Sequence, residues 1–106
     1  MKKATLSSMT KGWFVGDFDP TVLATAACEV ACKKYRAGDT EGRHVHRVAT
    51  EVTLIVSGSA KMNGEIIASG EIVTLLPGEA TDFTALEDTV TMVVKMPSVK
   101  GDKYLC

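Results

Sequence analysis

Apolar and polar residues alternate over short stretches along most of this chain, and glycine or proline separates many of these stretches from the next. Alternation with a period of two is typical of strands that bury one face of a sheet. An Asn63–Gly64 pair lies between two such stretches and is a strong signal for a tight hairpin turn. The pattern therefore predicts an all-β sandwich or barrel. The strands are expected within residues 28–38, 43–48, 51–58, 59–70 as a hairpin pair, 71–80 before a proline–glycine turn, 81–86 and 89–97.

Two segments outside this pattern flank the predicted strands. The first 20 residues are mixed in character, and we expect Trp13, Phe14 and Phe18 to pack this N-terminal arm against the body of the protein. Residues 20–35 begin with an alanine-rich stretch that favours helix, so a loop or a helical turn is expected there before the first long strand. Residues 98–106 are expected to form a polar tail.

The two faces of the expected strand at 51–58 differ in character. Glu51, Thr53, Ile55 and Ser57 share a mixed face, as expected for a strand that lines a partly hydrated interior. The opposite face is fully apolar. A strand with both faces occupied indicates a barrel that has a second layer or a partner subunit packed outside it.

The length and charge of the chain limit the kinds of protein to which it can belong. A chain of 106 residues forms one small domain. The 12 basic and 13 acidic residues leave a net charge of −1, which lacks the basic character of proteins that bind nucleic acid or an anionic membrane. No apolar run is long enough for a signal peptide or a membrane span, so a cytoplasmic location is expected. Three cysteines do not make a disulfide scaffold, and reduced thiols are expected.

The chain has only two histidines, and they lie one residue apart. On a strand, His44 and His46 point to the same side, about 6.6–7 Å apart at the backbone, and two imidazoles can reach one ion from there. If the chain turns after His46, Glu51 can return beside them and add a carboxylate oxygen. Two imidazoles and one carboxylate form a ligand set used for ferrous iron and for catalytic zinc. The alternative is a solvated strand edge that happens to carry two histidines.

The spacing of these three residues with two glycines favours the metal site. Gly38, five residues, His44, one residue, His46, four residues, Glu51, six residues and Gly58 follow one another in this order. This frame resembles the first conserved motif of the cupin superfamily, and every fixed position of that motif is present.

The later stretch GEIVTLLPGEATDF resembles the second cupin motif in a degenerate form. Leu76 stands at the proline position with Pro77 one place later, and Gly78 matches. Thr81 stands where the family places its fourth metal ligand, a histidine. Three arrangements remain open: a three-residue site completed by water, Asp82 turned inward by a bulge, or loss of the metal with an organic ligand in its place.

The resemblance implies a small double-stranded β-helix, also called a jelly-roll barrel, that is usually a homodimer. Residues 1–106 would form a single domain of this kind, with the barrel over about residues 28–97 and a short N-terminal arm. The implied cofactor is a divalent ion, either iron, manganese, nickel or zinc, held by His44, His46 and Glu51.

The resemblance also implies a small-molecule ligand in the mouth of the barrel. We expect a sugar or a hydroxy or keto acid, with isomerase, lyase or dioxygenase chemistry, and the catalytic residues stay open. The alternative is a non-catalytic binding module that has lost its metal. The residues expected to contact the ligand are Thr53, Thr81, Asp82, Phe83 and Tyr35.

Overall fold

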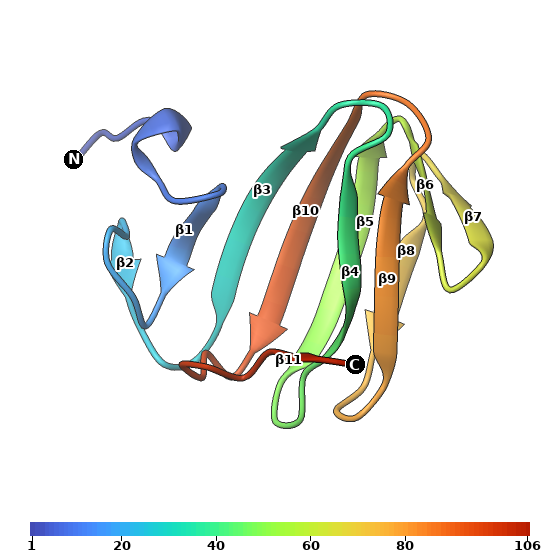
Figure 1. The fold of residues 1–106 in the computed structure, drawn as a ribbon. Coiled ribbons are helices and arrows are strands. Elements are labelled where there is room, and N and C mark those ends of the chain that lie inside the picture. Colours follow the sequence, from blue (N-terminus) through green and yellow to red (C-terminus); the bar gives the residue numbers. More distant parts are fainter.

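The computed structural model describes all 106 residues, and nearly all of its regular structure is β-strand (Figure 1). The one helix is a three-residue 3₁₀ turn, and no helix has the length and apolar character needed to cross a bilayer. The elements in chain order are η1 (Leu6–Ser8), β1 (Trp13–Gly16), β2 (Leu23–Ala24), β3 (Glu29–Tyr35), β4 (Thr40–Val45), β5 (Thr50–Ser57), β6 (Ser59–Met62), β7 (Glu65–Ala68), β8 (Ile72–Leu75), β9 (Ala80–Ala85), β10 (Thr89–Met96) and β11 (Tyr104–Leu105).

Two sheets face each other and enclose the interior (Figure 1). One sheet has the strand order β2-β1-β3-β10-β5-β8, and the other has the order β11-β4-β9-β6-β7. From β3 onward the chain changes sheet at every connection except the one between β6 and β7. Neighbouring strands are antiparallel except for β1 and β2. This arrangement confirms the prediction of an all-β double-stranded β-helix.

The structure differs from the sequence-based prediction at both ends of the chain. The N-terminal arm contributes β1, which pairs with β3. Residues 20–28 form the expected loop and not a helical turn, but this loop includes the two-residue strand β2. The expected polar tail contains β11, which pairs with β4. Such short strands have too few alternating residues to be detected from periodicity. Both terminal segments therefore extend the two sheets.

Two glycines of the sequence pattern have a clear conformational role. Asn63 and Gly64 have φ angles of 50° and 80°, as a type I′ turn requires, and they join β6 to β7 as predicted. Gly58, the last residue of the first motif, has a φ of 86°, and a Cβ atom there would lie 2.4 Å from the carbonyl oxygen of Asp88. Only glycine fits at this approach between two chain segments.

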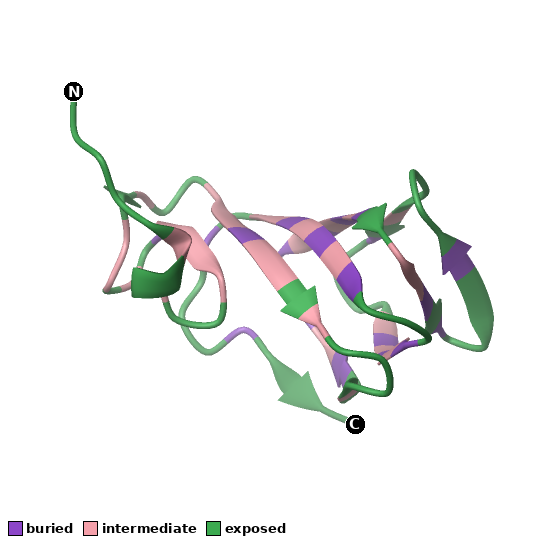
Figure 2. Ribbon diagram, turned by 90° about the horizontal axis from the view of Figure 1, so that it is seen from above, coloured by how far each residue is buried: buried purple, intermediate pink, exposed green.

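The interior is apolar at one end and polar at the other. Burial alternates along β5, β9 and β10, as expected for strands with one inward face (Figure 2). Glu51, Thr53 and Ile55 are the buried residues of β5, so the mixed face of this strand points inward, as predicted. The apolar end is a cluster of Ile55, Ala60, Met62, Ile67, Phe83 and Ala85.

The outward face of the six-stranded sheet is mostly apolar around β5 and β10. Val52 and Leu54 on β5 and Met92 on β10 are only half-buried. Val56 is 46% exposed, and Ile72 on the neighbouring strand β8 is 63% exposed. The chain thus provides no complete second layer over this face. Apolar surface left in contact with water commonly marks an interaction site.

Candidate functional site

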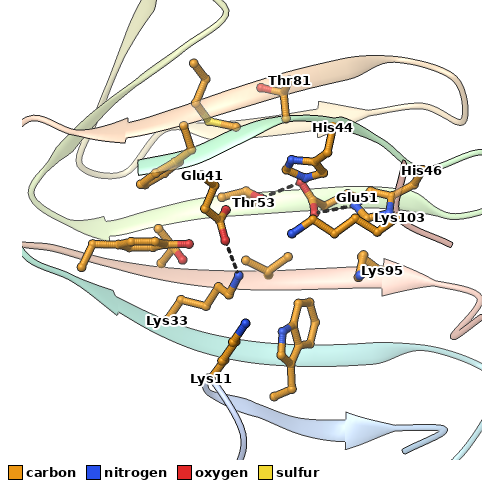
Figure 3. A pocket seen from close by; sticks show the side chains of 16 residues that line it. Lys11, Lys33, Glu41, His44, His46, Glu51, Thr53, Thr81, Lys95 and Lys103 are labelled. Atoms are coloured by element: carbon orange, nitrogen blue, oxygen red, sulfur yellow. Dashed lines mark hydrogen bonds and ion pairs between the residues drawn. The ribbon is translucent and has the colours of Figure 1, made fainter. Parts of the chain in front are cut away.

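Three side chains that can bind a metal ion converge at the polar end of the interior (Figure 3). His44 lies near the end of β4, His46 follows that strand, and Glu51 is the second residue of β5. Their exposed fractions are only 6%, 6% and 9%, and their ligand atoms lie within 4.8 Å of one another. This burial excludes the alternative of a solvated strand edge.

Backbone carbonyl groups fix the orientation of both imidazole rings. His44 Nδ1 donates a hydrogen bond to the Gly42 carbonyl at 2.8 Å, and His46 Nδ1 donates one to the Asp102 carbonyl. Because a carbonyl oxygen can only accept, Nδ1 carries a proton in each ring, and Nε2 is the nitrogen left to bind an ion. Nε2 of His46 lies 3.5 Å from Oε1 of Glu51.

His46 and Glu51 stabilise each other's charged forms. Hydrogen bonding to Glu51 raises the pKa of His46, although burial of the ring opposes this shift. Burial would raise the pKa of Glu51, but the hydrogen bond and charge of His46, together with the charges of Lys95 and His44, outweigh burial and lower that pKa. A divalent cation binds the same two groups once the proton on Nε2 has left, so metal and proton compete for this position.

The donor set fits a divalent ion. Two ligands about 2.1 Å from a zinc ion, at the tetrahedral angle, are roughly 3.4 Å apart. This separation is close to the 3.5 Å between His46 Nε2 and Glu51 Oε1. The other carboxylate oxygen of Glu51 accepts a hydrogen bond from Thr53 Oγ1 at 3.4 Å, and such a bond helps to orient a metal ligand. Two imidazoles and one carboxylate leave coordination positions for water or substrate.

Four of the five residues expected to contact a ligand line the cavity that contains these side chains. The cavity has a volume of about 230 Å³, and Thr53, Thr81, Phe83 and Tyr35 form part of its lining. The Tyr35 ring packs against Phe83 with a centroid distance of 4.4 Å. Burial, followed by the nearby charge of Glu41, raises the pKa of Tyr35. Its hydroxyl group therefore stays protonated at neutral pH and can donate to a ligand.

The fifth residue, Asp82, does not lie where the sequence predicted it. Thr81 on β9 pairs with His44, at the position of the family's fourth ligand, and its hydroxyl donates to the Asp82 carbonyl at 2.8 Å. Asp82 itself lies outside the cavity, and its carboxylate accepts the backbone N–H of Asn63 at 2.8 Å. A bulge that turns Asp82 inward, one of the three arrangements that the sequence left open, is absent from β9, because the register shift lies in β4, between Glu41 and His44. Asp82 therefore neither replaces the missing histidine nor contacts a ligand in this cavity.

Four lysine side chains also line the cavity, and the sequence did not identify them as site residues (Figure 3). Lys33 forms an ion pair with Glu41 at 2.8 Å, and Lys95 forms one with Glu29 at 2.7 Å. The other two have no carboxylate partner. The cavity is therefore richer in cationic than in anionic side chains. The four residues are Lys11, Lys33, Lys95 and Lys103.

The terminal segments bring part of this basic lining to the cavity. Trp13 of β1 lies between two of the lysines, with Lys33 Nζ 5.5 Å and Lys95 Nζ 4.7 Å from its ring centroid. Strand alternation places Lys33 on the same inward face of β3 as Tyr35, so the sequence pattern could have identified this lysine as a cavity residue. Lys11 and Lys103 lie outside the strands, where no periodicity marks an inward position.

The Lys33–Glu41 pair predicts a pH dependence of folding stability. Burial would raise the pKa of Glu41, but the Lys33 ammonium and further basic groups outweigh burial and lower that pKa below its ordinary value of 4.5. A carboxyl group with a lowered folded pKa stabilises the protein above its unfolded pKa, and this stability is lost as the pH falls through the folded pKa. We expect Glu41→Gln to lower the urea midpoint of unfolding at pH 7 and to differ much less from wild type at pH 3. The exposed Glu65→Gln is the control and should match wild type at both pH values; an equal deficit of Glu41→Gln at both would contradict the prediction.

Comparison with known proteins bears on the fold. No family model matches this chain, and no curated protein matches its sequence. An uncharacterized conserved protein with a double-stranded beta-helix domain from Klebsiella pneumoniae has a TM-score of 0.72 and 24% identity, over 80% of this chain and 75% of that one. KdgF from Halomonas sp. has a TM-score of 0.64 and 20% identity, over 71% and 74% of the two chains. An RmlC-like cupin from Shewanella frigidimarina has a TM-score of 0.66 and 15% identity, over 72% and 71%. This chain thus has the double-stranded β-helix fold of the cupin superfamily.

Proposed function

We propose that this protein binds one divalent metal ion through His44, His46 and Glu51 and uses it to act on a small carboxylic acid. The observation that carries the proposal is the convergence of three buried ligand side chains in a cavity whose charged lining is mostly basic. Iron, manganese, nickel and zinc all accept imidazole and carboxylate ligands. Manganese has additional support, because Bacillus subtilis oxalate decarboxylase, described with Mn(II) centers, has a similar fold at a TM-score of 0.66 and 15% identity, although this chain spans only 24% of it.

The charge of the cavity favours an acid over a neutral sugar. Its four lysines outnumber the two carboxylates in the lining, Glu41 and Glu51, and a divalent ion adds further positive charge. Lys11 and Lys103 have no ion-pair partner, so both are available for an anionic group of a ligand. A hydroxy or keto acid can place its carboxylate among the lysines and direct a second oxygen to the metal position. Attraction between these charges is stronger in a partly buried cavity than in bulk water.

When bound, the metal supplies Lewis acidity that polarises a hydroxyl or carbonyl oxygen of the acid. The chain's own residues bind and orient the acid: the lysines hold its carboxylate, and the aromatic rings of Trp13 and Phe83 limit access of water. The Tyr35 hydroxyl can donate a hydrogen bond or a proton to the bound acid. Isomerase and lyase reactions of hydroxy or keto acids use such groups. Proteins with similar folds include a sugar phosphate isomerase from Silicibacter pomeroyi and the DMSP lyase DddQ from Ruegeria pomeroyi. This chain covers only about half of each of these proteins.

A second candidate function is a binding module without catalysis, and Thr81 is the observation that favours it. This residue leaves the candidate site with three protein ligands, all from β4, β5 and the loop between them. A site of this kind exchanges its metal more readily than a site with four protein ligands. Such a module would bind the same acids as the proposed enzyme and would release them unchanged, so turnover of a bound acid distinguishes the two functions.

Metal loading tests the proposed centre directly. We expect wild-type protein loaded with Mn²⁺ to retain about one ion per chain after gel filtration, because three deprotonated ligands hold it. His46→Ala removes one ligand and should lose the ion. Thr81→His places an imidazole opposite His44 and should tighten Mn²⁺ binding by at least about tenfold. Elemental analysis and Mn²⁺ titration provide the two readouts. A wild-type protein that retains no ion after separate loading with manganese, iron, nickel and zinc would show the metal assignment to be wrong.

Binding of malate, a four-carbon hydroxy diacid, tests the role of the lysines. Lys103→Met should weaken malate binding to the Mn²⁺-loaded protein by about tenfold or more, because a charge-assisted hydrogen bond is lost. Lys100→Met is the matched control, since the Lys100 side chain is 76% exposed and lies outside the metal-centre cavity. Isothermal titration calorimetry measures both affinities. Equal malate affinity in the two variants, or equal binding of the neutral diamide of malate, would contradict selection for an acid.

We also propose that two copies of the chain pair through the outward apolar face of the six-stranded sheet. Val52 and Leu54 lie within this face, and a second copy would remove them and the exposed Val56 and Ile72 from water. Leu54→Lys should therefore convert a dimer to a monomer in sedimentation velocity. Ile66→Lys, at a 68% exposed position in the other sheet, should leave the dimer intact. A wild-type protein that is monomeric at micromolar concentration would rule out this pairing.

A further inference from the structure

The three candidate ligands lie close together in the sequence, between His44 and Glu51. They therefore belong to one connection, which leads from β4 in one sheet to β5 in the other. The strand β9, which pairs with β4, contributes no ligand, because it has Thr81 at the position that faces His44. Residues 46–49, between β4 and β5, have no regular secondary structure. The separation of His46 from Glu51 depends on the conformation of this loop. Interactions from elsewhere in the chain must fix the loop if the ligand geometry is to be preserved.

Asp102, in the C-terminal segment, supplies these interactions. Its carboxylate accepts backbone N–H bonds from Arg47 at 2.9 Å, from Val48 at 3.2 Å and from Ala49 at 2.9 Å. Its carbonyl oxygen accepts the Nδ1–H of His46. Asp102 is only 7% exposed, although it is an acid outside the regular strands. One residue thus binds every part of the loop that leads from His46 toward Glu51.

The segment that carries Asp102 is itself paired with β4, the strand that ends just before the loop. In β11, Tyr104 pairs with Val45 and Leu105 pairs with His44. The Arg47 guanidinium lies 3.9 Å from the centroid of the Tyr104 ring. These contacts place the chain end alongside β4, as Figure 1 shows for β11. The carboxylate of Asp102 is therefore held next to the loop by the contacts that Tyr104 and Leu105 make with β4 and Arg47.

We propose that Asp102 is a positioning residue of the metal centre, and that it holds the loop between β4 and β5 in the conformation that brings His46 next to Glu51. This inference rests on the proposed metal function. The Asp102 carboxylate holds the loop through three N–H donors, and its carbonyl keeps the His46 ring oriented with Nε2 toward Glu51. Asp102 does not touch the metal position. Its effect is transmitted through the loop and through the imidazole ring.

The proposal predicts a loss of metal affinity when the carboxylate is removed. Partners of metal ligands typically change affinity by about 10–100-fold when they are mutated. We expect Asp102→Ala to weaken Mn²⁺ binding within this range, and Asp102→Asn to weaken it less, because the amide oxygen still accepts one N–H. Asp102→Asn also provides a usable variant if Asp102→Ala does not fold. Titration of the full-length chain with Mn²⁺, followed by electron paramagnetic resonance of the unbound ion, measures each affinity.

Asp39→Ala is the matched control. The Asp39 carboxylate accepts the backbone N–H of Arg36 at 2.8 Å in the turn between β3 and β4, at the other end of β4 from the metal centre. Its removal takes away the same type of hydrogen bond without touching the loop at residues 46–49. We expect Asp39→Ala to have wild-type Mn²⁺ affinity, even if its thermal stability falls as much as that of the Asp102 variants.

The imidazole of His46 provides a second readout that general destabilisation would not change. In long-range ¹H–¹⁵N spectra of the metal-free protein, we expect Nδ1 of His46 to be the protonated nitrogen of the neutral ring in wild type and Asp39→Ala. The Asp102 variants should show a mixture of tautomers. If wild-type protein binds no Mn²⁺, the metal function fails while this spectrum still tests the positioning role. Unchanged His46 tautomer and unchanged Mn²⁺ affinity in both Asp102 variants would overturn the proposal.

Discussion

Each imidazole of the candidate metal centre is held through Nδ1 by a backbone carbonyl, His44 by Gly42 and His46 by Asp102. These bonds leave Nε2 of both rings as the available ligand atom, and the other features of the site depend on this choice of nitrogen. One of the carbonyls lies within β4 itself, and the other comes from the C-terminal segment. The orientation of two adjacent histidines is therefore set partly by local strand geometry and partly by a distant part of the chain.

The division of the barrel interior explains how a small domain tolerates such a polar site. Side chains of the apolar cluster, including Ile55, Met62 and Phe83, fill one end and remove apolar surface from water. At the other end, burial of a carboxylate such as Glu51 is unfavourable unless other groups compensate its charge. His46 and Thr53 interact with Glu51, and Lys33 pairs with Glu41. Lys95 pairs with Glu29, but Lys11 and Lys103 lack a carboxylate partner, and this imbalance is the physical basis for expecting an anionic ligand.

Sequence alone was sufficient for the features that follow strand periodicity or a spaced motif. Alternation along residues 51–57 placed Glu51 and Thr53 on the inward face, and the Asn63–Gly64 pair marked its hairpin. Prediction from the sequence failed for residues whose position depends on tertiary contacts between irregular segments. Lys103 and Asp102 lie in the segment that was predicted to be a polar tail. The sequence did not reveal their positions, because neither a two-residue strand nor a carboxylate that binds a loop has a periodic signature.

X-ray absorption spectroscopy of the zinc-loaded protein tests the central claim most directly, because it counts imidazole ligands at the bound ion. The orientation of His44 and His46 predicts two imidazole nitrogens at about 2.0–2.1 Å from zinc, with oxygen from Glu51 and from water completing the shell. The multiple-scattering pattern of both rings should disappear in part when either histidine is replaced by alanine. A spectrum with no imidazole contribution, or one dominated by cysteine sulfur at about 2.3 Å, would contradict the account.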